Sequence, residues 1–328
     1  MTDFASSETD LVADVLAKHW QIRDQVTRTQ LGVSRGTWRI GRHYWLSQAE
    51  HFRFVELSRQ AALLAHLNHY LKSEDPSFCV PEIVTSLSGD LVLGEGGYVW
   101  CLTRDIPGFH PAAEDATIYP VLSEGLARFH RTLRAFSQTE SFYVPDGICV
   151  KTRQGIDRLA DQAFMAFTSD PREKDILQTA AAWLLPRLNG FERLPRQIVH
   201  GDWTPQNVLF QGADQEIRLS GVLDIEAMAW DAVCVDVANS CSTLLMWSGL
   251  DRLEERMEQV IETYERWAGV SIERTDIHTA MLAHWFCHYW NWRDRLRVGI
   301  FGREVVGRLC LRISSTLSYV TDRITDSH

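Results

Sequence analysis

The chain has 328 residues, of which 45% are hydrophobic, so it is long enough for one two-lobed domain or two small ones. Its 33 basic and 43 acidic residues give a net charge of −10, which argues against a general nucleic-acid-binding protein. No apolar run approaches the roughly 20 residues of a membrane helix, and the N-terminus lacks the layout of a signal peptide. Seven scattered cysteines, including Cys234, Cys241 and Cys287 in apolar stretches, indicate buried thiols in a cytoplasmic protein. We therefore expect neither nucleic acid nor membrane among its partners.

The first part of the chain mixes helical and strand patterns. We predict a helix over residues 6–20, strands within 26–48, a helix over 53–71 and further strands within 82–105. The Gly-Glu-Gly-Gly segment at 94–97 lies between apolar strands and predicts a hairpin turn without a ligand. Gly32, Ser34 and Gly36 belong to an earlier strand-turn-strand pattern, in which backbone N–H groups can cradle phosphates.

Beyond residue 105 the pattern is mostly helical. We predict helices over residues 119–136, 154–167, 172–188, 237–247, 250–268, 274–297 and 302–323. Between them, one strand ends at Val199, and residues 208–210 and 217–223 form a hairpin. The sequence therefore predicts an α+β fold of two lobes. A small antiparallel-sheet lobe with a leading helix covers residues 1–105, and a larger, mainly helical lobe covers residues 106–328.

Residues 200–207, His-Gly-Asp-Trp-Thr-Pro-Gln-Asn, are the most informative segment. They follow an apolar strand, so Asp202 is expected in a loop at a strand end, where a rigid scaffold exposes functional side chains. Pro205 stiffens the return of this loop towards Asn207. Phosphoryl transfer needs a carboxylate beside the acceptor hydroxyl, and Asp202 is the residue type that orients or deprotonates such a group.

A second acidic position, Asp224, follows the next predicted hairpin. Mg²⁺ prefers hard oxygen ligands and takes one or two carboxylates together with phosphate and water. Asn207 and Asp224 both offer such oxygens at the ends of neighbouring strands, so we predict that they hold Mg²⁺. Two surface loops that carry Asp and Asn by chance are the alternative, and the complete constellation argues against it.

This constellation resembles the aminoglycoside phosphotransferase and choline kinase family, whose fold is protein-kinase-like. The similarity rests on His200, Gly201 and Asp202, four intervening residues, Asn207, and then Asp224 at the start of a short acidic segment. The resemblance implies that Asp202 is the catalytic base and that His200 braces the loop. It also implies that Asn207 and Asp224 are the magnesium ligands.

The resemblance covers about residues 30–242, including the expected nucleotide site. Residues 99–105 resemble the hinge strand, whose backbone would hold the adenine of ATP, with Thr103 among the ATP-binding residues. Asp231 and Asp236 resemble the structural acidic pair that follows the metal-binding Asp in this family.

One departure concerns the grip on the phosphates of ATP. The family has a lysine or arginine on the third strand of the small lobe and a glutamate on the next helix. Ser47 and Gln60 occupy these two positions here. Losing only one of the two charges would leave the other charge buried without a partner, whereas losing both leaves a neutral pair. The candidates for a displaced cation are Arg35, Arg39, Arg42 and Arg53. An active kinase with a displaced cation, a pseudokinase and a shifted alignment stay open as explanations.

The predicted helix over residues 274–297 is the candidate acceptor site. Helical spacing puts Trp285, His288 and Trp292 on one face of this helix and His284 on another. Aromatic rings can box a cation or stack on a flat ring. A core stripe is the alternative, which the polar His288 argues against. His284 and His288 have a metal-binding spacing, but no glutamate of the HExxH type lies between them and magnesium is the metal of the family. We therefore expect no metal at these histidines.

The leading function is an ATP-dependent O-phosphotransferase that acts on a hydroxyl of a small molecule. An aminoglycoside-like antibiotic, a sugar or an amino alcohol fits, and the negative net charge is compatible with a cationic acceptor. Four acidic residues can recognise amines or form a solvated helix face: Asp251, Glu254, Glu255 and Glu258. The alternatives are a kinase-fold binding module or pseudokinase, and an enzyme that acts on a peptide in a biosynthetic pathway.

Overall fold

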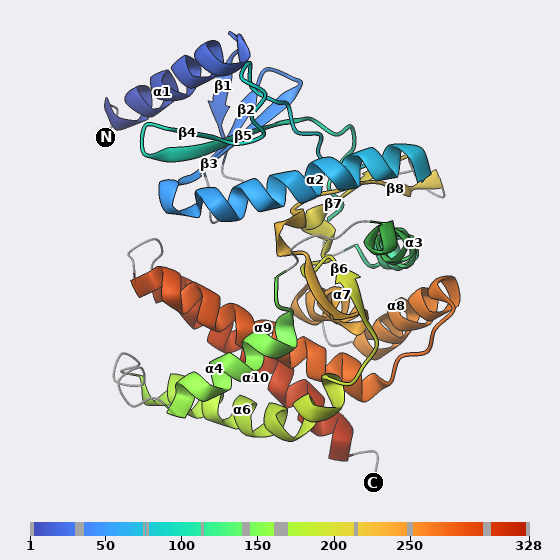
Figure 1. Ribbon diagram of the computed structural model, residues 1–328. Coiled ribbons are helices and arrows are strands. Elements are labelled where there is room, and N and C mark those ends of the chain that lie inside the picture. Colours follow the sequence, from blue (N-terminus) through green and yellow to red (C-terminus); the bar gives the residue numbers. More distant parts are fainter. Residues whose placement is uncertain are drawn as a thin grey trace. The chain divides into compact units, whose positions relative to one another are not determined.

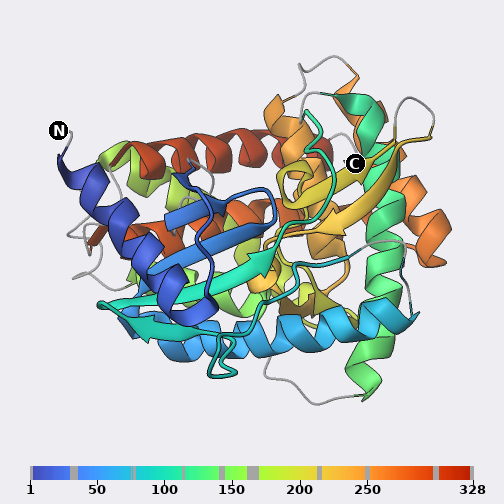
Figure 2. The same cartoon turned by 90° about the horizontal axis from the view of Figure 1, so that it is seen from above.

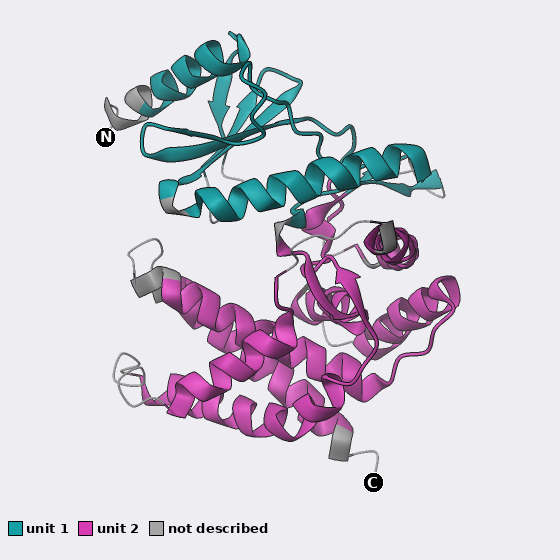
Figure 3. Cartoon of the chain, in the orientation of Figure 1, with its two compact units in different colours: residues 1–109, 209–226 teal, residues 110–208, 227–328 magenta. Residues whose placement is uncertain are grey.

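The structure is a computed structural model that describes residues 3–29, 36–74, 76, 79–112, 115–139, 145–160, 170–212, 216–247, 252–297 and 303–325. The chain divides into two compact units (Figure 3). Unit 1 contains residues Met1–Phe109 and Leu209–Glu226, and unit 2 contains residues His110–Val208 and Ala227–His328. No helix within the described ranges is long and apolar enough to cross a membrane. The predicted lobe boundary after residue 105 stays a prediction.

Unit 1 contains a five-stranded antiparallel sheet in the order β1-β2-β3-β5-β4. Its strands are β1 (Val26–Arg28), β2 (Gly36–Ile40), β3 (Tyr44–Glu50), β4 (Leu93–Glu95) and β5 (Tyr98–Arg104). The helices of this unit are α1 (Asp3–Trp20) and α2 (Phe54–Glu74), and Figures 1 and 2 show both beside the sheet. Gly96 and Gly97 have φ values of +64° and +81° in the turn between β4 and β5, which confirms the predicted hairpin.

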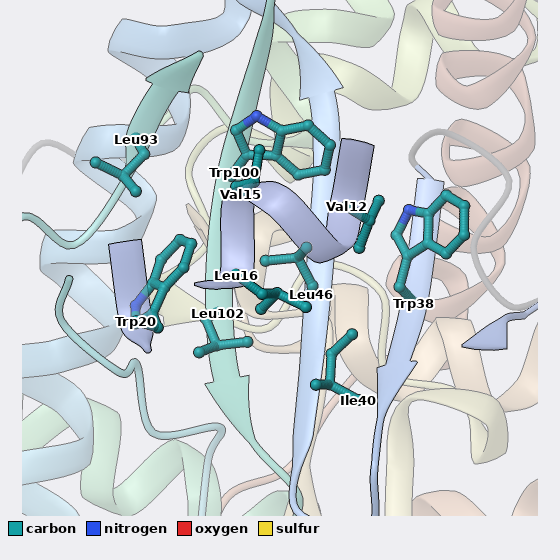
Figure 4. Packing of buried hydrophobic residues seen from close by; sticks show 10 residues of the cluster. All are labelled: Val12, Val15, Leu16, Trp20, Trp38, Ile40, Leu46, Leu93, Trp100 and Leu102. Carbon is teal, nitrogen blue, oxygen red and sulfur yellow. The ribbon is translucent and has the colours of Figure 1, made fainter. Parts of the chain in front are cut away.

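One face of this sheet packs against α1 (Figure 4). Side chains of a strand alternate between its two faces, and in β2, β3 and β5 the even-numbered ones point towards α1. The fully buried members of this core include Trp38, Ile40, Leu46, Trp100, Leu102 and, from α1, Val12. Trp20 donates from Nε1 to the carbonyl of Val84 over 2.9 Å, so the last residue of α1 is also tied to the unit.

The opposite face of the sheet packs against α2. Ala49 and Val99 from the sheet share a core with Leu57 and Ala61 from the helix. Ser47 precedes Ala49 by two residues in β3 and therefore lies on the same, α2-facing side of the strand.

Unit 1 also contains the hairpin of β7 (Val208–Gln211) and β8 (Arg218–Val222), apart from the first residue of β7. Cys79 donates its N–H to Ser220 over 3.0 Å and accepts from Val222 over 2.8 Å. Phe109 and Phe210 exchange two backbone hydrogen bonds of 2.9 and 3.0 Å. The hairpin is therefore hydrogen-bonded to two segments, around Cys79 and Phe109, that lie far before it in the chain.

Unit 2 is mainly helical. Its helices are α3 (Tyr119–Thr139), α4 (Ile148–Ala160), α6 (Pro171–Phe191), α7 (Cys234–Trp247), α8 (Leu253–Ala268), α9 (Arg274–Arg297) and α10 (Arg303–Thr325). α9 contacts α4, α6, α7 and α10, so it forms the centre of this unit (Figure 1). The predicted helix over 154–167 corresponds to α4, and its second half lies outside the described residues from 161 onward.

A two-stranded antiparallel sheet in unit 2 joins β6 (Arg196–Val199) to β9 (Ala229–Ala232). The sequence did not predict β9, because its four residues include an exposed Trp230 and a buried Asp231, the reverse of apolar-in and polar-out alternation. The seven cysteines are free thiols, and Cys234, Cys241 and Cys287 are buried as predicted.

Leu102→Ala in β5 is expected to lower the free energy of unfolding by about 2–5 kcal/mol, because a fully buried leucine loses its transfer energy and leaves a cavity. Leu87→Ala is the matched control, since Leu87 lies in the same unit and is 62% exposed. Its effect should stay within about 0.5 kcal/mol. Urea unfolding followed by circular dichroism checks both variants, and equal effects would contradict the assignment of Leu102 to the core.

Candidate active site

The loop that carries Asp202 is anchored by a buried carboxylate. Asp236 lies in the first turn of α7 and is fully buried, and the positive end of the helix dipole favours a negative charge there. Its oxygens accept the backbone N–H groups of His200 and Gly201, each over 2.7 Å. The ring of His130 lies 2.8 Å from the same carboxylate and 2.8 Å from the hydroxyl of Tyr264. The start of the loop is thus fixed by a chain of buried hydrogen bonds.

The next residues leave the loop little freedom. Gly201 has φ +83°, and a Cβ atom at this position would lie 2.1 Å from the carbonyl oxygen of Ala227, so only glycine fits. His200 accepts the backbone N–H of Asp202 on Nδ1 over 3.3 Å, which places a bracing contact at the residue that the resemblance assigned to bracing. Trp203 is fully buried and stacks on Phe129 at 5.5 Å between ring centroids.

Asn207 holds the carboxylate of Asp202 at the end of the loop. Its amide nitrogen donates to the carbonyl oxygen of Asp202 over 2.8 Å and to the carboxylate oxygen Oδ2 over 2.9 Å. Because both bonds use the amide nitrogen, the Oδ1 atom of Asn207 is left to serve as an oxygen ligand. The donor chemistry of Asn207 therefore fits a hard cation such as Mg²⁺.

The environment of Asp202 favours a base. Burial raises the pKa of its carboxyl above the ordinary value, and His200, Asn207 and Arg312 only partly offset this increase. A carboxylate with a raised pKa is a stronger proton acceptor than an ordinary aspartate. Asp202 is nevertheless partly exposed, so a reacting group has access to it.

The histidines of α9 lie beside Asp202. One nitrogen of His284, one of His288 and one carboxylate oxygen of Asp202 all lie within 4.8 Å of one another. The two histidine rings are 4.3 Å apart, and the His284 ring lies 4.6 Å from Trp285, which in turn carries the guanidinium of Arg312 at 4.5 Å. Burial lowers the pKa of His284 well below its ordinary value, so its ring is neutral at neutral pH.

The structure thus places two further residues, His284 and Arg312, beside the predicted acceptor residues. Sequence reasoning put His284 on another face of the helix from His288, although four-residue spacing is the signal that places both on one face. Arg312 comes from α10, and no local pattern could have predicted its approach to Trp285. Trp292 lies one turn beyond His288 on α9 and is partly exposed.

The predicted nucleotide residues lie in unit 1. Gly32 and Ser34 lie outside the described residues, and Gly36 opens β2. Ser47 pairs in register with Thr37 and Cys101 in the sheet. The side-chain amide of Gln60 donates to Glu56 over 3.3 Å, and the hydroxyl of Thr103 donates to the carbonyl of Trp45 over 3.4 Å.

Two of the four arginines considered as substitute cations have acidic partners, one is exposed, and one lies outside the described residues. Arg39 binds Asp105 through two hydrogen bonds of 3.1 and 3.0 Å and lies over the ring of Trp45 at 4.6 Å. Arg53 forms an ion pair of 3.1 Å with Glu56. Arg35 lies outside the described residues, and Arg42 is exposed. The guanidinium of Arg39 is therefore engaged by Asp105, the residue that follows β5.

Asp224 has φ +54°, in the left-handed region that non-glycine residues seldom adopt. Such backbone strain concentrates at functional sites. Asp224 belongs to unit 1, whereas Asp202 and Asn207 belong to unit 2. Its joint role with Asn207 as a magnesium ligand stays a prediction from the sequence motif.

The other acidic residues that the sequence analysis named, Asp231 and those at α8, form hydrogen bonds or ion pairs where they are described. Asp231 accepts the backbone N–H groups of Ile148 and Ala232. Three glutamates of α8 form ion pairs with arginines, in the pairs Glu254–Arg323, Glu255–Arg252 and Glu258–Arg274. Asp251 lies outside the described residues. These three carboxylates, which the sequence offered for amine recognition, therefore each have an arginine partner.

Comparison with known proteins identifies the family and the fold of the chain. The model of a family described as the phosphotransferase enzyme family matches residues 26–270. No curated protein sequence matches the chain. Among solved structures, the GDP complex of aminoglycoside 2′-phosphotransferase-IIIa is similar with a TM-score of 0.68, 15% identity and coverage of 97% of this chain and 99% of that one.

Two further solved structures have the same fold. A microcompartment-associated aminopropanol kinase has a TM-score of 0.66 at 13% identity, with coverage of 97% of this chain and 98% of that one. An aminoglycoside phosphotransferase from Streptomyces rimosus has a TM-score of 0.58 at 14% identity, with coverage of 88% and 99%. These similarities confirm the predicted kinase-like α+β fold.

Gly201→Ala is expected to lower the free energy of unfolding by more than about 1 kcal/mol, because the methyl group collides with the Ala227 carbonyl and φ is positive. Gly190→Ala in α6 is the control, since nothing lies within 4 Å of the added Cβ atom. That substitution should stabilise the protein by about 0.5–1 kcal/mol. Urea unfolding distinguishes them, and an unchanged midpoint for Gly201→Ala would contradict the loop geometry.

Proposed function

Because this chain belongs to the phosphotransferase enzyme family, we propose that it transfers the γ-phosphoryl group of ATP to a hydroxyl group of a small molecule. The observation that carries the proposal is the Asp202 carboxylate. It is held by Asn207 at the end of a loop whose start is fixed on Asp236, and burial raises its pKa. A positioned carboxylate of this kind is the group that phosphoryl transfer to an alcohol requires.

In the proposed reaction, Asp202 orients the acceptor hydroxyl and accepts its proton as the oxygen attacks the γ-phosphorus. The amide of Asn207 fixes the rotamer of Asp202, and His200 and Asp236 fix its backbone. We assign Mg²⁺ to Asn207 and Asp224, where it would neutralise charge on the phosphates. Catalysis then depends on positioning and electrostatics rather than on a covalent intermediate.

For the acceptor side we propose Trp285, His288 and Trp292, joined by His284. The rings suit a flat or ring-shaped hydroxylated molecule, such as a sugar or an aminocyclitol. Next to Asp202 lie the positive charge of Arg312 and the neutral ring of His284. The positive charge disfavours a protonated amine at this point, so we place the neutral hydroxyl group of the acceptor beside Asp202 and any amine of the acceptor farther away. Aminoglycosides, sugars and amino alcohols form the test panel, because the fold is shared with aminoglycoside phosphotransferases and an aminopropanol kinase.

The direct test is incubation of the purified protein with ATP, Mg²⁺ and each member of this panel, followed by ³¹P NMR. A new phosphomonoester signal identifies the acceptor and supports the proposal. If ATP binds but is neither hydrolysed nor used to phosphorylate any acceptor, the result would favour the second candidate function, a binding module.

That second candidate is a kinase-fold module that binds a nucleotide or other ligand without phosphoryl transfer. The observation in its favour is the neutral Ser47 on the α2-facing side of β3, together with the engagement of Arg39 by Asp105. Without a cationic side chain on this strand, a kinase-like protein lacks one of the contacts that normally bind the phosphates of ATP.

Asp202→Asn is expected to lower turnover by about 10²–10⁴-fold, because the amide cannot accept the proton. The wild-type rate should rise with pH through the raised pKa of Asp202. Because the folded-state pKa of Asp202 is raised, ionising this carboxyl destabilises the folded protein. Asp202→Asn removes that cost, so the variant should melt at the same or a higher temperature at pH 7. The difference should disappear below about pH 4, where the carboxyl is protonated in both the folded and the unfolded state. Calorimetric melting and the ³¹P assay check both effects, with the exposed Asp175→Asn as control. Full turnover by Asp202→Asn would exclude Asp202 as the base.

Ser47→Lys combined with Gln60→Glu is expected to strengthen ATP binding by at least about tenfold, because it restores a charge-assisted contact to the phosphates. Either substitution alone should gain less, since it introduces one unpaired charge. Calorimetric titration with ATP measures the change. No gain in the double variant would contradict the alignment of Ser47 with the phosphate-binding position.

A further inference from the structure

The group formed by Asp202, His284 and His288 has the composition of a metal site. The ligand atoms of the three residues lie within 4.8 Å of one another, and both histidines come from α9, four residues apart. Four-residue spacing places two side chains on adjacent turns of one helix face, which is how a helix presents two imidazoles to one ion. The carboxylate comes from a separate, rigidly anchored loop.

An independent observation concerns His284, one of the three residues of this group. The side chain of His284 is only 3% exposed, and its Nδ1 atom has no hydrogen-bonding partner among the described residues. A buried polar atom without a partner costs free energy, so native structures usually supply one in the form of water or an ion. In the proposed phosphotransfer His284 lines the acceptor side but neither takes up nor releases a proton.

We propose that Asp202, His284 and His288 bind a divalent transition metal ion of the zinc class. Imidazole nitrogen suits zinc, copper, iron and nickel, whereas Mg²⁺ requires oxygen ligands. Two histidines and one carboxylate supply three of the four zinc ligands and leave one position for water. Two ligand atoms of a tetrahedral zinc ion lie about 3.4 Å apart. Because the three ligand atoms lie within 4.8 Å of one another, no pair needs to approach by more than about 1.4 Å to close the shell.

The proposed ion would hold the carboxylate that phosphoryl transfer uses. A carboxylate bound to zinc no longer accepts a proton readily, so zinc would inhibit the enzyme. This consequence rests on the proposed function, whereas zinc binding itself does not. His288 and Asp202 are partly exposed, which gives an ion access to the site.

The test uses the full-length protein after treatment with a chelator, and Zn²⁺ as the probe. We expect one Zn²⁺ per chain in a competition titration with a chromogenic chelator. Binding should weaken at least about tenfold in His284→Ala and in His288→Ala, because losing a direct ligand costs no less than losing an outer-shell partner. The exposed His69→Ala is the control and should keep the wild-type affinity. Co²⁺ gives a second readout, because its visible absorption changes when imidazole enters its shell.

Equal Zn²⁺ affinity in the wild type and in His288→Ala would overturn the proposal, as would the lack of any Zn²⁺ binding by the wild type. His288 is only partly buried, so its variant keeps the test decisive if His284→Ala fails to fold. The Mg²⁺-dependent phosphotransfer assay on the chelator-treated protein is independent. Phosphotransfer without Zn²⁺ binding would refute the metal site alone, and Zn²⁺ binding without phosphotransfer would refute the proposed function alone.

Discussion

The buried carboxylate of Asp236 is the constraint on which the candidate site depends. It receives two backbone N–H groups from His200 and Gly201, contacts His130, and sits at the positive end of α7. These partners offset the large cost of burying a charge, and in return they fix the direction in which the loop leaves β6. Removing this carboxylate would release the backbone of the two residues that precede Asp202. The role of Asp236 is therefore structural.

With the loop fixed, the reactivity of Asp202 is set by its neighbours. Burial raises its pKa, while the Asn207 amide, the His200 ring and Arg312 oppose that increase. The same carboxylate also lies within 4.8 Å of the ligand atoms of two histidines of α9, and we have proposed both proton transfer and metal coordination for it. The two proposed uses exclude each other at any one time, because a metal-bound carboxylate is a poor base. Together, the two proposals would link phosphotransfer to the availability of a transition metal.

Sequence reasoning predicted most elements of the fold, because hydrophobic periodicity reports local structure well in long helices such as α9 and α10. It predicted the family from the spacing of Asp202, Asn207 and Asp224, which is a local pattern. It missed β9, whose exposure pattern inverts the usual alternation. The approach of Arg312 to Trp285 depends on how α10 packs against α9, and no local pattern encodes that packing.

The most direct test of the central claim is calorimetric titration of the purified protein with ATP in the presence and absence of Mg²⁺. If Asn207 and Asp224 hold a magnesium ion, ATP binding should be saturable, should require Mg²⁺ and should weaken in Asp224→Ala, because Asp224 would hold the ion that neutralises charge on the phosphates. The absence of binding at millimolar ATP with Mg²⁺ present would contradict the account. It would mean that the neutral Ser47 and Gln60 have left the fold without a working nucleotide site.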